Sequence, residues 1–195
     1  MKKTANKKFT VILTCIGVML ILAAVGLMLF SHLGGKNAQT NAKEIVNKMY
    51  SLMPDVKNSA PDGRSNVNMP MLEIDGTDFV GIIEASENTL PIYCKWDSSE
   101  VTKYPCRYMG SMHDGSLIIG GSDNKGQFDF VKTISNGESI FITDTTGLRF
   151  RYTVTDINRT KDVSTDYLSS QEADLILFAR NTYSLDYTVI LCDLL

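Results

Sequence analysis

Cysteine and histidine are the side chains of this sequence that could do covalent chemistry near neutral pH. A thiolate is a strong nucleophile and an imidazole exchanges a proton in that range, so together they could cut or transfer acyl groups. The candidates are Cys15, Cys94, Cys106, Cys192, His32 and His113. They form no Cys-x-x-Cys pair or other metal-binding spacing, so we expect neither a metal site nor a cofactor.

Several of these side chains have simpler expected roles. Cys15 lies within an apolar segment, Cys94 follows a strand-like run, and both are typical of packed, unreactive thiols. His113, in Ser-Met-His-Asp-Gly-Ser, is predicted to be a surface loop residue. The alternative is an active site with Cys94 or Cys106 as nucleophile and His113 as base. A disulfide is allowed outside the cell, but the sequence does not indicate which two cysteines would form it.

Two polar motifs could each bind a ligand or form a turn. Ser122 and Asp123 follow Gly120-Gly121, a pair that could bring backbone close to a ligand but is more typical of a turn at a strand end. The sequence Asp-Thr-Thr-Gly at 144–147 is predicted to be a turn, and it gives a calcium loop little support.

The N-terminal end predicts a membrane anchor. Residues 9–30 contain no charged side chain, and as a helix they would span about 33 Å, which matches a bilayer core of roughly 30 Å. A cleaved signal peptide is the alternative, but its apolar region is usually shorter. Four lysines within residues 1–8 place that end in the cytoplasm by the positive-inside rule, and hence residues 31–195 outside.

The remaining chain carries an acidic balance. The first 32 residues hold four lysines and no acid, which leaves 15 basic and 22 acidic side chains, a formal charge of −7. This charge argues against nucleic acid or an anionic lipid surface as partner. A mildly acidic extracytoplasmic domain is expected.

The region 31–70 is predicted to contain a linker and a short helix. Residues 34–41 are polar and glycine-containing, whereas 42–53 place apolar side chains at helical spacing, at Ile45, Val46, Met49, Leu52 and Met53. Residues 55–70 are rich in Asn, Ser, Pro and Gly and indicate a loop that leads to the domain at 71–195.

The domain itself is predicted to be mainly β. Short β-type runs with turn signals between them lie at 71–75, 79–85, 90–96, 116–121, 139–144, 148–157, 173–179 and 187–194. Eight such runs without long helices between them favour a closed β-barrel, with a short helix expected within 164–173.

The order of these segments resembles the class B-like sortases, membrane-anchored cysteine transpeptidases of Gram-positive bacteria. The resemblance runs through residues 73–85, 89–96, 103–111, 116–154 and 173–192. It implies an eight-stranded barrel and an enzyme that cuts a sorting signal and joins the protein to peptidoglycan or a pilin. It also implies structural roles for Cys106 and Cys192.

The catalytic positions of that family are occupied by other residues here. The family's histidine position, in Ala-Gly-His-Asn, matches Ser122, and its cysteine position, in Leu-x-Thr-Cys, matches Arg180 after Ala179. The arginine that should begin the last strand, five residues before Cys192, is Tyr187. None of the three can supply the family's nucleophile, base or oxyanion charge in its usual place.

The sequence thus predicts a catalytically inactive pseudo-sortase. We expect it to hold a sorting-signal-like peptide, a pilin or an active sortase in the barrel groove, where Arg180 could pair with a carboxylate. The groove candidates are Gly121, Ser122, Asp123, Ala179, Arg180 and Tyr187. The alternatives are a divergent transpeptidase or peptidase that uses a relocated cysteine and a purely structural envelope scaffold.

Overall fold

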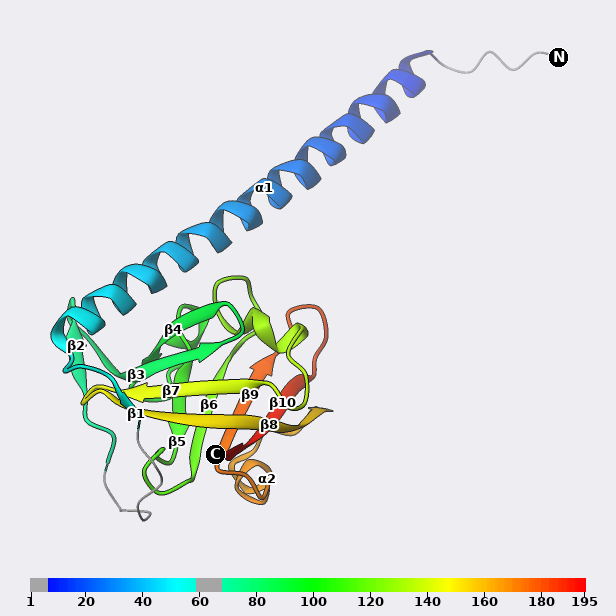
Figure 1. The fold of residues 1–195 in the computed structure, drawn as a ribbon. Helices are drawn as coiled ribbons and strands as arrows, with labels where there is room; N and C mark the ends of the chain where they lie inside the picture. Colours follow the sequence, from blue (N-terminus) through cyan, green and yellow to red (C-terminus); the bar gives the residue numbers. More distant parts are fainter. Residues whose placement is uncertain (1–6, 59–67) are drawn as a thin grey trace. The chain divides into compact units, whose positions relative to one another are not determined.

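The computed structural model describes residues 7–58 and 68–195, and for residues 7–10 and 27–38 it describes the backbone alone. The chain divides into two units, one ending at Asn37 and the other comprising Ala38–Leu195. The division falls within the first helix, α1, which spans Lys7–Leu52 (Figure 1). Helix thus continues through the predicted linker at 34–41, and the boundary between the two units falls inside that linker. Helix propagates through it because each added residue gains a backbone hydrogen bond once the helix is nucleated.

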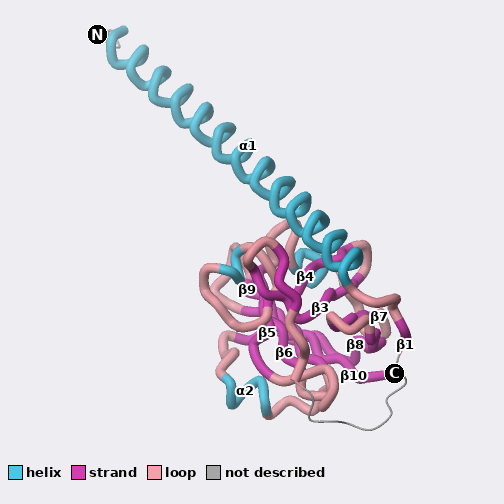
Figure 2. Tube along the Cα trace, turned by 90° about the vertical axis from the view of Figure 1, so that its left-hand side faces the viewer, coloured by secondary structure: helices cyan, strands magenta, loops and turns pink. Residues whose placement is uncertain are grey.

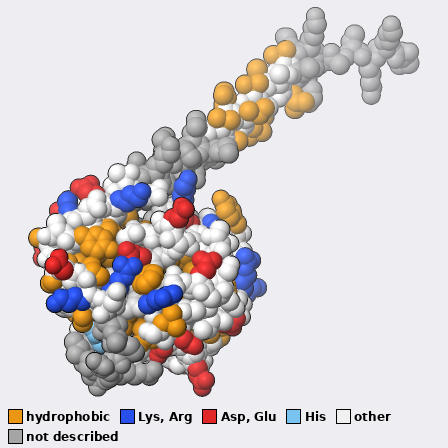
Figure 3. Space-filling model, viewed as in Figure 1, with side chains coloured by type: hydrophobic (Ala, Val, Ile, Leu, Met, Phe, Trp, Pro, Cys, Tyr) orange, Lys and Arg blue, Asp and Glu red, His pale blue; other side chains and the backbone are white. Residues whose placement is uncertain are grey.

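The N-terminal part of α1 exposes apolar side chains. Between Val11 and Val25 the large hydrophobic residues are each about half exposed or more, and Figure 3 shows this stretch covered mainly by hydrophobic atoms. Among the side chains that the structure describes, no helix is long and apolar enough to cross a membrane. The side chains of residues 9, 10 and 27–30 of the predicted anchor, and residues 1–6 of the predicted tail, lie outside the described part.

The C-terminal turns of α1 form the predicted amphipathic helix. Val46, Met49 and Met53 are buried against Ile74, Phe79 and Ile82 of the barrel unit. Leu52 does not belong to this face, since 63% of it is exposed, which corrects the prediction. The helix ends at Leu52 because a residue that precedes proline, here Met53 before Pro54, is disfavoured in helical conformation.

Eight strands close into a barrel. In the order in which they pair, they are β3 (Thr77–Ala85), β4 (Asn88–Tyr93), β5 (Cys106–Met109), β6 (Leu117–Ser122), β9 (Leu175–Arg180), β10 (Tyr187–Leu194), β8 (Leu148–Thr160) and β7 (Ser139–Asp144). β7 pairs with β3 and completes the ring. The β4–β5 and β6–β9 pairs are parallel and the others are antiparallel.

Short elements decorate this ring. β1 (Lys57–Asn58) pairs with β8, and β2 (Leu72–Ile74) pairs with β3. Two 3-10 turns, η1 (Glu100–Thr102) and η2 (Phe128–Lys132), and one helix, α2 (Thr165–Ser169), lie in the connections. Figures 1 and 2 show α2 at the end of the barrel where β9 begins. The short helix predicted within 164–173 is thereby confirmed, as is a closed eight-stranded barrel.

One of the eight predicted barrel strands lies outside the barrel, and another segment takes its place. The run at 71–75 forms β2, outside the ring, whereas the eighth barrel strand is β5, which the β-type runs missed. β5 has only four residues and follows Pro105, so it lacks a recognisable strand pattern. Its conformation depends on pairing with β6, where Cys106 lies opposite Gly120.

The parallel strands β6 and β9 lie at the centre of the fold. The first five residues of each are buried, because the barrel core covers one face and a second apolar cluster covers the other. Ile118, Ile176 and Phe178 belong to that outer cluster together with Leu168 of α2. Parallel strands covered on both faces typically have continuous apolar runs of this kind. Both strands then end at the same edge, where polar residues begin.

Candidate functional site

The three positions at which the sequence resemblance expects catalytic residues adjoin at this edge. Ser122, the last residue of β6, pairs with Arg180, the last residue of β9. Arg180 in turn pairs with Tyr187, the first residue of β10. The strand register therefore places Ser122, Arg180 and Tyr187 in a row across three neighbouring strands.

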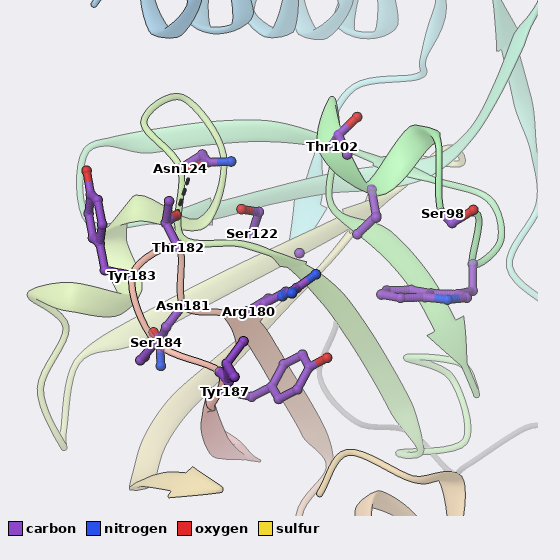
Figure 4. A pocket seen from close by; sticks show the side chains of 14 residues that line it. Ser98, Thr102, Ser122, Asn124, Arg180, Asn181, Thr182, Tyr183, Ser184 and Tyr187 are labelled. Carbon is purple, nitrogen blue, oxygen red and sulfur yellow. Dashed lines mark hydrogen bonds between the residues drawn. The ribbon is translucent and has the colours of Figure 1, made fainter. Parts of the chain in front are cut away.

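All three line one cavity with a volume of about 540 Å³. Figure 4 shows the Arg180 side chain extended between Ser122 and Tyr187, with its guanidinium directed toward the side where Ser98 and Thr102 lie. Three segments form the walls: the β4–β5 connection, the end of β6, and the β9–β10 loop. The lining residues are Trp96, Ser98, Val101, Thr102, Gly121, Ser122, Asn124, Arg180, Asn181, Thr182, Tyr183, Ser184, Leu185 and Tyr187.

Arg180 has no counter-ion among the residues that the structure describes. Its side chain is exposed, and within the described part of the chain no carboxylate forms an ion pair with it. Its backbone carbonyl accepts a hydrogen bond from the Asp123 amide at 3.1 Å. The strand end is thus fixed while the guanidinium remains available to a ligand.

Asp123 does not belong to this cavity, although it was a groove candidate. Asp123 is 3% exposed, and its carboxylate accepts hydrogen bonds from the Thr182 amide, at 2.8 Å, and from the Thr182 hydroxyl. It also forms an ion pair with Lys132 at 3.2 Å, beside a neighbouring cavity of about 620 Å³. The carboxylate fastens the β9–β10 loop to the end of β6, so its role is structural.

Ala179 is likewise removed from the groove. It is fully buried in the main barrel core, because alternate residues of a strand point to opposite faces and its neighbour Arg180 faces outward. The prediction that Ala179 lines a ligand groove is therefore wrong.

Gly120 and Gly121 lie within β6, not in a turn as expected. A Cβ on Gly120 would collide with the rings of Phe178 and Trp96 on the outer face. A Cβ on Gly121 would lie 2.8 Å from the Phe128 ring. The two glycines are needed because aromatic rings pack directly on the strand, and Gly121 alone lines the cavity.

The β9–β10 loop is held by its own hydrogen bonds. The Asn181 amide donates to the Asp186 carbonyl at 3.1 Å, and the Asn181 side chain donates to the Asp186 carboxylate at 2.8 Å. Ser184 donates to the same carboxylate. The hydrogen bonds from the Ser184 hydroxyl and from the Asn181 side chain hold the pKa of Asp186 below its usual value, so this carboxylate already has donors within its own loop.

Cys94, Cys106 and Cys192 are buried, and none of them lines the cavity. They are free thiols, and no disulfide joins them. Burial raises the pKa of Cys106 and of Cys192 to about 12 and raises that of Cys94 as well. At neutral pH these groups are protonated, which makes them poor nucleophiles.

His113 is not the surface residue that the sequence predicted. Only 10% of its side chain is exposed, and its Nε2 lies 3.1 Å from the Asp144 carboxylate. The ring also packs edge-on against Phe150. Asp144 accepts from the Thr146 and Leu148 amides as well, so His113 joins the β5–β6 connection to the predicted turn at 144–147. Among the described residues no group of His, Cys, Asp or Glu could hold a metal ion.

The sequence reasoning missed the apolar wall of the cavity. Trp96 is 41% exposed, and Tyr183 and Leu185 in the β9–β10 loop are 96% and 82% exposed. Large hydrophobic side chains so exposed around one cavity are typical of a binding surface. The only available signal was that Trp96 is the sole tryptophan of the chain, which does not identify its neighbours.

Comparison with known proteins identifies the fold. No protein-family model matches the sequence, and no curated protein matches it significantly. Solved sortase structures do resemble this chain. Sortase A from Corynebacterium diphtheriae has a TM-score of 0.53 at 14% identity, covering 83% of this chain and 84% of that chain.

Two further structures are similar. Sortase A from Listeria monocytogenes has a TM-score of 0.51 at 16% identity and covers 60% of this chain and 87% of its own. Sortase C from Clostridium perfringens, solved with the C-terminal cell wall sorting motif, has a TM-score of 0.51 at 16% identity and covers 61% and 71%. These are class A and class C enzymes, so the class B-like subgroup stays a prediction. The likenesses show that this chain has the sortase fold.

Proposed function

We propose that this protein is a membrane-anchored, extracytoplasmic pseudo-sortase that binds without catalysis. Its ligand is a sorting-signal-like peptide, a pilin or an active sortase at the cell envelope. The observation that carries the proposal is the row Ser122, Arg180 and Tyr187, which lines one cavity. By the sequence resemblance, these three residues stand where an active sortase has its catalytic residues.

The chemistry of this row argues against transpeptidation. A guanidinium with a pKa above about 12 is no nucleophile, and a serine hydroxyl cannot serve as an acid or base near neutral pH. Tyr187 supplies one neutral hydrogen-bond donor where the family has an arginine. Because catalytic groups of this kind act as a unit, the loss of all three leaves binding and orientation alone.

A relocated cysteine site loses support from the same structure. Cys94 and Cys106 are buried, with raised pKa values, and among the described residues neither thiol forms a hydrogen bond with His113. A nucleophile must reach both its substrate and its base. Neither thiol is exposed to the cavity in which a peptide would lie.

Two features support binding. The cavity is within the range of about 300–1,000 Å³ typical of ligand sites, and exposed apolar side chains stand around it. In addition, the similar sortase C from Clostridium perfringens was solved with a cell wall sorting motif. The proposed ligand is a segment of the same general kind.

The membrane anchor belongs to the proposal. The uncharged segment 9–30 after four lysines is the sequence feature that supports it. Cell fractionation tests it: the full chain should remain with membranes in high salt and alkaline carbonate and be released by detergent, and protease added to intact cells should digest the barrel. Release by salt alone, or protection from the protease, would contradict the anchor or its orientation.

Binding and catalysis are tested together on the full chain in detergent micelles. A panel of sorting-signal peptides with a fluorophore and a quencher reports cleavage as increased emission, and singly labelled versions report binding as anisotropy. We expect saturable binding and no cleavage. Cleavage above the rate of a boiled sample would overturn the inactive assignment, and the absence of binding to every peptide would exclude the peptide form of the proposal.

A further inference from the structure

We infer that the cavity selects a carboxylate flanked by an apolar side chain, so that its ligand is an acidic or carboxyl-terminal peptide segment. This inference rests on the proposed binding function and specifies its ligand. It follows from three observations on the cavity: an uncompensated positive charge, two hydroxyl groups beside it, and a rigid aromatic wall.

The described lining of the cavity carries positive charge and no negative charge. Of the described residues that line the cavity, Arg180 alone is basic, and none is acidic. A guanidinium presents a fixed fork of N–H donors that matches the two oxygens of a carboxylate. An anionic ligand group would therefore meet attraction without a competing protein carboxylate in the cavity wall.

The nearby carboxylates are already occupied by other donors. Asp123 binds Thr182 and Lys132, and Asp186 binds Asn181 and Ser184. Asp97, beside the lining residue Ser98, accepts from Ser99 at 2.8 Å. Each of these three carboxylates accepts its hydrogen bonds from groups other than Arg180. The Arg180 guanidinium is therefore not part of an ion pair with any of them.

Two hydroxyl groups can complete the recognition. Ser122 and Tyr187 lie on either side of Arg180 in the strand register and in Figure 4. Neither hydroxyl has a hydrogen-bond partner among the described residues. A carboxylate held by Arg180 leaves lone pairs that these donors can reach, which would fix its orientation.

The apolar wall is organised in advance. The Trp96 ring packs on Tyr108 and Phe178, with centroids 5.3 Å and 5.5 Å away, and Tyr187 packs on Phe178 at 6.3 Å. Because neighbouring rings support Trp96, its exposed face offers a surface for an aliphatic or aromatic side chain at little cost in side-chain entropy. Leu185 provides further apolar surface across the cavity.

The same features disfavour phosphorylated ligands and nucleic acids. A single arginine faces the cavity, and the region after residue 32 carries a formal charge of −7, which would repel a polyanion. One carboxylate suits one guanidinium. The source of the carboxylate is either a free chain terminus or an Asp or Glu side chain, since both present the same group.

The test uses the full chain in detergent micelles and four fluorescent hexapeptides of the same apolar core. One ends in Leu-Phe with a free carboxylate and one is its C-terminal amide. The other two are amidated and contain an internal Asp or Asn before Leu-Phe. We expect at least one carboxylate peptide to bind about tenfold tighter than its neutral counterpart, as one charge-assisted pair predicts. The pair that shows the difference identifies the source.

Arg180→Gln should remove that difference, whereas Arg159→Gln should keep it. Arg159 is an exposed arginine that lines the neighbouring cavity, so its substitution changes the net charge equally. Equal binding of all four peptides, with no effect of Arg180→Gln, would overturn the carboxylate inference and leave peptide binding intact. Absence of binding by every peptide would overturn both. Thermal unfolding of each variant shows that it is folded.

Discussion

Gly120→Ala is the substitution that most directly tests how the apolar wall is built. Gly120 lies within β6, and an added methyl group would occupy space filled by the Phe178 and Trp96 rings. Both rings belong to an interlocked group with Tyr108, at centroid distances of 5.3–5.5 Å. Since β6 is paired on both sides, the rings must move and the strand cannot.

Overpacking of a core costs about 1–3 kcal/mol, which for a domain of this size lowers the unfolding temperature by roughly 2–12 °C. Because Trp96 is the sole tryptophan, its emission reports the displacement without a label. We expect a red shift as the ring leaves Phe178 and gains water. The assay is thermal unfolding together with emission spectra of the folded variant.

Gly121→Ala is the matched control. Its added methyl group would press on Phe128 inside the barrel, at 2.8 Å, so it should destabilise the domain without moving Trp96. A second check is a double-mutant cycle: Phe178→Leu should reduce the cost of Gly120→Ala, because the smaller side chain makes room for the methyl group. An unchanged emission spectrum and melting temperature for Gly120→Ala would refute the packing of the rings on β6.

Three further predictions concern the groups around the cavity. Arg180→Cys should create a thiol that reacts with Ellman's reagent within seconds to minutes, whereas the buried native thiols of the barrel should react only as it opens; equally fast reaction of Cys94, Cys106 or Cys192 in the unaltered protein would contradict their burial. Asp123→Ala should lower the free energy of unfolding by about 1–3 kcal/mol in urea titrations, since it removes the acceptor of the Thr182 amide and the ion-pair partner of Lys132. A change within error would show that the loop is not fastened there. The free energy of unfolding should fall as the pH rises above 9. Burial raises the pKa of Cys106 and of Cys192 to about 12 in the folded state, whereas both thiols lose their protons near pH 9 when the chain is unfolded. The stabilisation is therefore complete below pH 9 and is lost between about pH 9 and pH 12. Replacement of both by Ala should flatten this alkaline decline in melting temperature.

The sequence predicted the barrel because seven of its strands carry strong local patterns. The buried parallel pair β6 and β9 is continuous in apolar residues, and turn signals separate most strands. β5 was not predicted because its four residues, which follow a proline, are too few to show an alternation of apolar and polar side chains. Its strand conformation depends on pairing with β6. The helical conformation of the linker at 34–41 was missed because its local composition favours coil, whereas helix continues through it from both sides.

The candidate site was only partly accessible from sequence. The positions of Ser122, Arg180 and Tyr187 followed from the order of segments, and the register then explains why they adjoin. The inward orientation of Ala179 and the role of Asp123 as a fastener depend on strand faces and on a partner 59 residues away, Thr182. Trp96 as a wall and His113 as the partner of Asp144 are likewise long-range contacts that no local pattern encodes.

The central claim is that the sortase fold here binds without covalent chemistry, and intact-mass spectrometry of the full chain tests it most directly. The protein is mixed with excess sorting-signal peptide, quenched with acid at intervals from seconds to hours, and weighed together with the peptide. We predict an unchanged protein mass and an intact peptide under conditions where Trp96 emission shows that the peptide is bound. A protein mass increased by an acyl fragment of the peptide, or accumulation of a cleaved peptide that Cys94→Ala or Cys106→Ala abolishes, would contradict the account.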